Sequence, residues 1–153
     1  MGSALSEGGV SREEELRRLV AELQLLEGVA ESLQSRINMA NAAITELRLA
    51  KSTLEGLEKG GPGSQLLVPI GGGSYIMAKL QSLEKVIVGI GAGVSVERSL
   101  EDAKKGLDER VEAIRKARDS LQKRLDEVLE RIRASRDRAR ELSSKLRGEA
   151  GGA

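Results

Sequence analysis

Two glycine-rich segments are the residues whose spacing could do chemistry, because glycine-rich loops can cradle phosphates. They are Gly89-Ile90-Gly91-Ala92-Gly93 and Gly71-Gly72-Gly73. A dinucleotide-binding loop needs G-x-G-x-x-G between a strand and a helix, with an acidic residue about 20 positions later. Here the third glycine comes one position early, Val94-Ser95-Val96 favours a strand, and no P-loop lysine follows the glycine triplet. We therefore predict that both segments are hairpin turns.

Catalytic and metal-binding side chains are scarce in this sequence. It contains no histidine and no cysteine, which removes the commonest general base and metal ligand together with all thiol and disulfide chemistry. Aspartate and glutamate total 24, but none belongs to a recognisable pocket motif, and we interpret them as helix surface. The sequence predicts no enzyme, no cofactor and no metal site.

The composition points to long helices rather than to a globular core. Tyr75 is the one aromatic residue, while 32% of the residues are charged. The net charge is +1, so no whole-chain attraction to nucleic acid or membrane is expected. The longest uncharged stretch, 60–78, contains two prolines and six glycines and cannot span a bilayer as a helix. Because no signal peptide is recognisable in 1–10, we predict a cytoplasmic protein.

A first coiled-coil helix is predicted over residues 11–59. Ser11 and Glu14 form a capping-box pattern at its start, and Lys59-Gly60-Gly61-Pro62 ends it. Apolar residues recur at alternating spacings of three and four, which is typical of a coiled coil. Eleven of twelve positions in this seam are apolar: Leu16, Leu19, Leu23, Leu26, Ala30, Leu33, Ile37, Ala40, Ile44, Leu47, Lys51 and Leu54.

A second coiled-coil helix is predicted over residues 99–147, with Ser99 as its cap and Gly148 at its end. Ten of twelve seam positions are apolar: Leu107, Val111, Ile114, Arg118, Leu121, Leu125, Val128, Ile132, Ser135, Ala139, Leu142 and Leu146. Ion pairs four residues apart are expected on its outer surface. They are Glu112–Lys116, Asp119–Lys123, Glu127–Arg131 and Glu141–Lys145.

The two seams have nearly equal length, which favours an antiparallel pair within one chain. Small residues then face large ones: Ala40 opposite Leu121, Ala30 opposite Ile132, and Ala139 opposite Leu23. The interruptions at Lys51 and Arg118 have two interpretations. In the first, these residues set the register of the helices or the choice of partner. In the second, their aliphatic stems lie beside a loosened seam while their charges reach solvent.

Residues 60–98 change character and are predicted to form two β-hairpins that oligomerise. They hold nine of the 18 glycines. Four strands are predicted, over 66–70, 75–80, 85–90 and 94–98. Isolated two-stranded hairpins are marginal in water, so their apolar side chains and open edges predict assembly with other chains. The fold class is therefore α+β, a long antiparallel coiled coil with two central hairpins, and residues 1–10 and 148–153 are expected to be disordered.

This order of elements resembles the α-class subunit of prefoldin, an archaeal and eukaryotic co-chaperone. The resemblance is carried by Leu67-Val68-Pro69-Ile70-Gly71-Gly72-Gly73-Ser74-Tyr75-Ile76 and by Lys85-Val86-Ile87-Val88-Gly89-Ile90-Gly91-Ala92-Gly93-Val94-Ser95-Val96-Glu97. It implies an ATP-independent chaperone subunit in a hexamer of two α and four β subunits, whose hairpins join an oligomeric β-barrel. It further implies that coiled-coil tips bind unfolded polypeptides and transfer them to a group II chaperonin.

Carried onto this sequence, the resemblance implies two sets of site residues. The expected assembly residues are Val68, Ile70, Tyr75, Ile76, Val86, Ile87, Val88, Val94 and Val96. The candidates for contact with unfolded polypeptides are Leu16, Leu19, Val20, Leu142 and Leu146, at the end of the coil far from the hairpins. From the seam pattern alone, these five could instead simply complete the coil.

Two other functions are weighed against the chaperone. A structural coiled-coil adaptor would use the hairpins only to oligomerise and would not hold unfolded chains. A nucleic-acid-binding arm would use the basic second helix, where the arginines are Arg131, Arg133, Arg136, Arg138 and Arg140. The absence of stacking aromatics and the acidic first helix count against that arm, so we expect neither nucleic acid nor a membrane as partner.

Overall fold

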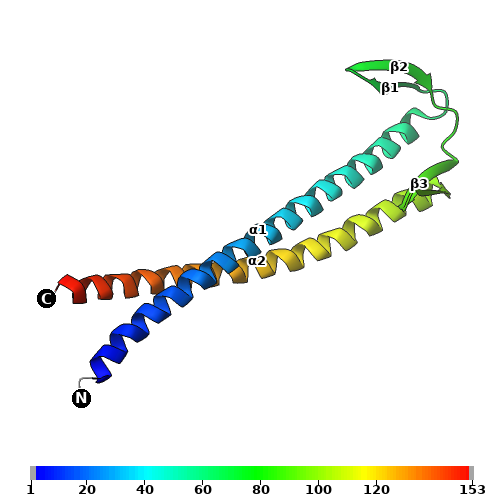
Figure 1. Cartoon of the computed structure of the whole chain (residues 1–153). Helices are drawn as coiled ribbons and strands as arrows, with labels where there is room; N and C mark the ends of the chain where they lie inside the picture. Colours follow the sequence, from blue (N-terminus) through cyan, green and yellow to red (C-terminus); the bar gives the residue numbers. More distant parts are fainter. Residues whose placement is uncertain (1–2, 152–153) are drawn as a thin grey trace. The chain divides into compact units, whose positions relative to one another are not determined.

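The computed structural model describes residues 3–151, with side chains from residue 11 onward. Along the chain, a long helix is followed by two β-hairpins and then by a second long helix (Figure 1). The elements are α1 (Ser3–Gly60), β1 (Gln65–Gly71), β2 (Ser74–Lys79), β3 (Lys85–Gly91), β4 (Val94–Ser99) and α2 (Leu100–Gly151). The predicted fold class is therefore confirmed, and each strand end lies within one residue of its predicted position.

The described residues divide into two compact units. One contains the first part of α1 and the last part of α2, residues 3–39 and 118–151, and we call it the coil unit. The other contains residues 40–117, which are the rest of both helices and the two hairpins, and we call it the hairpin unit.

Packing in the coil unit follows the predicted seam. Leu33, Ile37 and Leu125 form a buried cluster. The partly buried hydrophobic residues packed against it are Ala30, Leu121 and Val128. All six are seam positions, so the alternating spacing of three and four correctly identified the face that α1 and α2 bury.

In the hairpin unit the helices bury Ile44, Leu47 and Leu107, all predicted seam residues. They also bury Ala103, which was not predicted. Ala103 and Leu107 line a groove together with Val86 of β3. A heptad pattern describes contacts between two helices and carries no signal for a strand lying against them.

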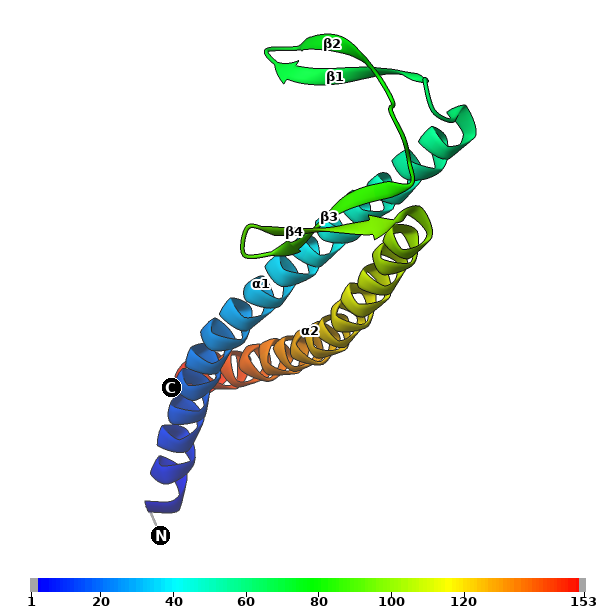
Figure 2. The ribbon, with the colours of Figure 1, turned by 90° about the vertical axis from the view of Figure 1, so that its right-hand side faces the viewer.

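The two hairpins are built alike, as Figure 2 shows for both antiparallel pairs. Pro69 pairs with Tyr75 and Gly71 with Ser74, so the register shifts at Ile70. The same shift occurs twenty residues later, where Gly89 pairs with Ser95 and Gly91 with Val94. An extra residue in one strand is a β-bulge, and it increases the local twist.

Both predicted turns are present, with left-handed backbone at every central position. In the first turn, φ is 104° at Gly71, 59° at Gly72 and 73° at Gly73. In the second, φ is 104° at Gly91, 52° at Ala92 and 75° at Gly93. Turns of this hand match the twist of the flanking strands. The glycine-rich segments are thus hairpin turns, as predicted.

Three helix ends can be compared with their predicted signals. Ser99 caps α2 as predicted, because the Asp102 amide donates to its Oγ at 3.1 Å. The predicted start at Ser11 is wrong, since α1 begins at Ser3 and residues 3–10 are helical rather than disordered. The preceding turn supplies backbone carbonyls to the amides near Ser11, so no side-chain cap is needed there.

The predicted end at Gly148 is also wrong, because α2 continues to Gly151. Gly148 does not adopt a positive φ. A glycine ends a helix when it adopts the left-handed conformation, and otherwise costs only about 1 kcal/mol inside it. The rest of the two segments expected to be disordered, residues 1–2 and 152–153, lies outside the described residues.

Candidate functional site

The first hairpin, β1–β2, exposes apolar side chains on both faces. Cross-strand partners share a face, so Val68 and Ile76 lie on one face and Leu67 and Met77 on the other. All four are exposed, as are Ile70 and Tyr75. Leu67 and Met77 were missed by the sequence-based set of assembly residues, although the period of two along a strand places them on the second face.

The second hairpin, β3–β4, has one covered and one exposed face. Val86 and the cross-strand pair Val88 and Val96 are half-buried. On the opposite face Ile87 is 73% exposed beside its partner Glu97. Two further apolar residues, Ile90 and Val94, are exposed near the turn. The predicted assembly residues therefore divide into an inner and an outer group in this hairpin.

An apolar groove of about 640 Å³ separates the inner face of β3 from the helices of the hairpin unit. Val86 and Val88 line it from the strand. Leu47, Ala50 and Leu54 line it from α1, and Ala103, Leu107 and Ile114 from α2. The half-buried valines of β3 thus share this groove with seam residues of both helices, and the space between them remains open.

Ion pairs join the two helices within the hairpin unit. Lys51 Nζ lies 2.8 Å from both carboxylate oxygens of Asp108, and this hydrogen bond raises the pKa of Lys51 above 10.5 despite partial desolvation. Lys104 Nζ lies 2.9 Å from Glu58 Oε2, which raises the pKa of Lys104 in the same way. The charge of Lys51 is thus paired with a carboxylate of the other helix, which is compatible with both interpretations of this seam position.

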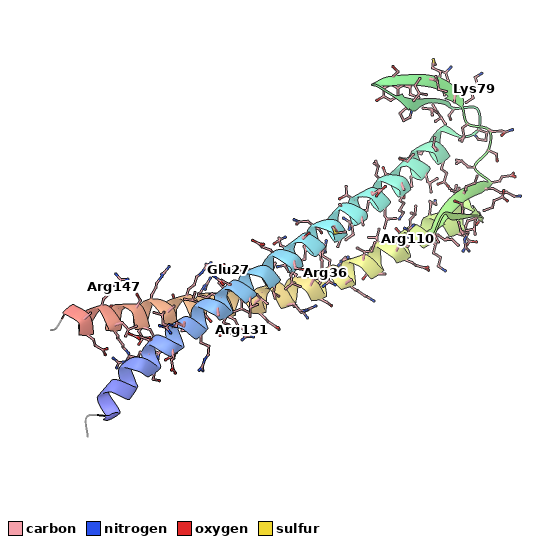
Figure 3. All side chains as sticks on the ribbon, viewed as in Figure 1. Glu27, Arg36, Lys79, Arg110, Arg131 and Arg147 are labelled. Atoms are coloured by element: carbon pink, nitrogen blue, oxygen red, sulfur yellow. The ribbon has the colours of Figure 1, made fainter. Side chains whose placement is uncertain are left out.

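Ion pairs in the coil unit follow the heptad repeat. Glu15 binds Arg138 at 3.0 Å, and seven residues later Glu22 binds Arg131 at 2.8 Å. Glu27 of α1 likewise binds Arg136 of α2 at 2.9 Å, and Figure 3 labels Glu27 and Arg131 in this part of the helix pair. Positions flanking the seam carry such pairs in coiled coils. We had predicted that Arg131 would pair with Glu127 of its own helix, but the structure pairs it with Glu22.

Two other predicted features of α2 involve pairs within the helix. Arg118, the second seam interruption, binds the neighbouring Asp119 at 3.2 Å. Glu141 binds Lys145 at 3.1 Å, as predicted, and also Arg138. These two cations, Lys145 first, lower the pKa of Glu141 below 4.5.

The five candidates for polypeptide contact have unequal exposure. Leu142 is 1% exposed and is the most completely enclosed side chain among residues 11–151. Leu16, Leu19 and Leu146 are half-buried, while Val20 is 47% exposed. Contact by Leu142 would require separation of the helices, so Val20 is the candidate most accessible to a partner.

The same unit exposes apolar residues that the sequence-based set missed. On α1, Leu25 is 73% exposed, and Val29 and Met39 are also exposed. On α2, Leu129 is exposed. All four lie outside the seam, where a coiled coil normally places polar residues. Their departure from that pattern was the signal available in the sequence.

Sites for enzyme or metal chemistry were also sought among the described residues. Across residues 11–151, no polar or charged side chain is buried. The described part of the chain also contains no group of three or more acidic residues arranged to hold a metal ion. Neither α1 nor α2, as far as they are described, has an apolar run suited to crossing a bilayer.

Comparisons with known proteins agree on one family. Residues 26–145 match the family model described as Prefoldin subunit. A Prefoldin subunit alpha from Methanopyrus kandleri is 35% identical over 69% of this chain and 68% of the relative. Another, from Thermofilum pendens, is 34% identical over 85% of this chain and 95% of the relative.

A solved structure supports the same relationship. A chain of filamentous PFD from Methanocaldococcus jannaschii superposes with a TM-score of 0.62 at 27% identity. The match covers 79% of this chain and 94% of that one.

Proposed function

Because the chain belongs to the prefoldin family, we propose that it is an α-class subunit that binds unfolded polypeptides without ATP and transfers them to a group II chaperonin. Proteins of this family are chaperones that assemble with other prefoldin subunits. The proposal adds the partners for this chain, which are β-class subunits in a hexamer of two α and four β, and a cytoplasmic location. The observation that carries it is the set of large apolar side chains exposed on the coil unit, chiefly Val20, Leu25 and Val29.

Assembly is assigned to the hairpins. The first hairpin offers apolar residues on both faces and two open edges, and such edges pair readily with strands of another chain. The second hairpin offers Ile87, Ile90 and Val94 on its free surface. Joining strands from several subunits into a barrel would cover these residues and pair the open edges.

Polypeptide binding is assigned to the coil unit. Contact between apolar groups is non-directional, so one surface can hold many different unfolded sequences. Leu25 and Val29 are four residues apart and therefore neighbours on one face of α1. Leu16, Leu19 and Leu146 are half-buried, so the exposed part of each side chain adds contact area. A single coil binds weakly, and several coils on one platform gain affinity through high effective concentration.

The test is the aggregation of a chemically unfolded protein diluted into buffer without ATP, followed by light scattering. The complete assembly with β-class partners should suppress the scattering. Replacing Val20, Leu25 and Val29 with serine should abolish most of that suppression while leaving the assembly intact. Leu49→Ser is the matched control, because Leu49 is an exposed leucine of α1 in the hairpin unit and should be dispensable.

A structural adaptor is the second candidate, supported by the enclosure of Leu142 and the half-burial of Leu16, Leu19 and Leu146. An intact assembly that never suppresses aggregation would favour the adaptor. Equal loss of suppression in the triple variant and in Leu49→Ser would also contradict the assignment to Val20, Leu25 and Val29. Sedimentation of each variant separates these outcomes from simple loss of assembly.

A further inference from the structure

Four arginines of α2 lie along one ridge in the coil unit. They are Arg133, Arg136, Arg140 and Arg147. Their spacings of three, four and seven residues place them on the same helix face. The two remaining positions of this ridge, 129 and 143, hold Leu129 and Ser143, so no acidic residue interrupts it. We call these four residues the arginine row; Figure 3 labels Arg147, near the end of α2.

The arginine row is poorly neutralised by the side chains of residues 11–151. Arg133 reaches a carboxylate only at 4.0 Å, that of Glu130 on the same helix, and both side chains are 77% exposed. Arg147 donates to the hydroxyl of Ser143 at 3.2 Å. Among the side chains of residues 11–151, Arg140 has no ion-pair partner.

Other arginines of the same helix behave differently. Arg131 and Arg138 bind Glu22 and Glu15 of α1 at 2.8 and 3.0 Å. In the arginine row, only Arg136 has a partner among the side chains of α1 described from residue 11 onward, Glu27 at 2.9 Å. Arg131, Arg136 and Arg138 thus join the two helices, while Arg133, Arg140 and Arg147 are exposed to solvent.

A groove of about 540 Å³ runs along this ridge. Leu129 and Ile132 supply its apolar lining, and the three arginines at 133, 136 and 140 border it. Asp137 is the single carboxylate among the lining residues. A ligand that fits such a groove combines apolar groups with several negative charges.

Val20 lies on the same side of the helix pair. Glu27 of α1 binds Arg136, so the face of α1 that carries Glu27 adjoins the arginine row. Val20 precedes Glu27 by seven residues, which is two helical turns, and therefore shares that face. An exposed apolar residue proposed to contact unfolded chains thus neighbours a poorly neutralised basic surface.

We infer that the arginine row binds acidic segments of polypeptides, with Leu129 and Val20 contacting the apolar side chains between the carboxylates. This inference rests on the proposed holding of unfolded chains and specifies which chains are held best. Arginine suits the role because its planar guanidinium binds carboxylates through two parallel hydrogen bonds. Nucleic acid fits less well, because Tyr75, the only aromatic residue in the chain, lies in the hairpin unit.

The arginine row should raise the affinity for acidic segments moderately, and this gain should depend on the salt concentration. An exposed ion pair changes affinity by roughly two- to fivefold, so Arg133, Arg140 and Arg147 together give about tenfold. Exposed charges are screened over about 10 Å at moderate ionic strength. Acidic chains should therefore lose their advantage as salt is added, while purely apolar contacts persist.

The experiment measures fluorescence anisotropy of two labelled, unstructured peptides bound to the complete assembly. One peptide alternates leucine with glutamate, and the other alternates leucine with glutamine. The test variant is Arg133→Gln with Arg140→Gln and Arg147→Gln. Arg18→Gln with Arg36→Gln and Lys123→Gln is the matched control, because it removes the same charge from other exposed faces of the coil unit. Circular dichroism verifies that all variants keep their helices, since glutamine is a good helix former.

The expected result is tighter binding of the glutamate peptide by the natural sequence. The test variant should weaken that binding about tenfold and leave the glutamine peptide within about twofold, and the control should change neither. Equal binding of both peptides would overturn the inference and leave the holding function standing. An equal effect of the control would assign the preference to net charge and also overturn it.

Two further outcomes are informative. If the assembly binds neither peptide, the holding function itself fails, and the inference fails with it. If single-stranded RNA of the same length displaces the glutamate peptide and binds more tightly, the arginine row is a nucleic-acid site. Loss of the glutamate preference at high salt, with binding of the glutamine peptide retained, supports the inference.

Discussion

The two hairpins share a register and a bulge but differ in what covers them. In β3–β4, Val88 and Val96 are half-buried, while the corresponding residues of β1–β2 are exposed. The pair Val68 and Ile76 corresponds, twenty residues later, to Val88 and Val96. The comparison shows that a similar apolar pair is exposed in one hairpin and half-buried in the other. What separates them is the presence of helices beside the strand.

The largest expected effect comes from the exposed pair. Replacing Val68 and Ile76 with threonine keeps β-branching but adds hydroxyl groups to the surface assigned to assembly. Association with partner subunits should fall by at least about tenfold, since each apolar side chain contributes roughly 1–3 kcal/mol when fully covered. Sedimentation measures the loss. The thermal unfolding midpoint of the isolated chain should stay unchanged, and a marked fall would show that this hairpin also supports the fold.

In the second hairpin, the same change to the matched pair should reduce the stability of the fold rather than association. Replacing Val88 and Val96 with threonine places hydroxyl groups beside the apolar groove and should lower the free energy of unfolding by about 2 kcal/mol. Urea denaturation followed by circular dichroism measures this change. If the variant unfolds like the natural sequence and only association weakens, the two hairpins are equivalent and the comparison is wrong.

The turns provide a smaller, reciprocal test. Gly72 and Ala92 occupy matched positions with φ of 59° and 52°, where only glycine is free of strain. Gly72→Ala should destabilise the first hairpin by about 1 kcal/mol, because an L-residue is disfavoured there. Ala92→Gly should stabilise the second by about 0.5 kcal/mol after the entropy of the unfolded chain is counted. Amide hydrogen exchange of each hairpin reports both changes, and effects of the same sign would contradict this account.

The smallest effect is expected from pH near neutrality. The folded-state pKa values of Lys51 and Lys104 are raised above 10.5, so their contribution is complete below that pH and is lost as pH rises through the folded values. The pKa of Glu141 is lowered below 4.5, so its contribution is present above that pH and is lost on acidification through the folded value.

With no histidine in the chain, the unfolding midpoint should be flat between about pH 6 and 9. It should fall in strong alkali and in acid. Thermal melts across this range measure the profile, with Lys51→Met as the control that should reduce the alkaline decrease. A midpoint that changes between pH 6 and 9 would contradict the assignment of these three groups.

Periodicity made the helices and strands predictable, because each depends on neighbours at fixed spacing. Leu33, Ile37 and Leu125 were identified as seam residues by a repeat that the packed cluster confirms. The glycine turns were predictable because positive φ strongly favours glycine. The start of α1 was not predictable, because the capping pattern at Ser11 can also occur inside a helix, and α1 begins at Ser3.

Tertiary contacts between elements were harder to predict. The sequences of β1 and β3 are both apolar, and neither indicates which hairpin lies against the helices. Leu142 and Val20 were both candidates for polypeptide contact, yet one is enclosed and the other exposed. Pairs such as Glu22–Arg131 also depend on how two helices align. The heptad spacing of glutamates on one helix and arginines on the other was a usable signal for them.

The bulges at Ile70 and Ile90 have a consequence for protein solubility. A flat strand with an open edge can template endless stacking of identical chains into cross-β fibres. The register shift after Pro69 ends the regular ladder of β1, and Pro69 itself lacks an amide hydrogen to offer a neighbour. The same shift interrupts β3 after Gly89. The bulges therefore shorten the regular stretch of each open edge, which opposes the stacking of identical chains into cross-β fibres.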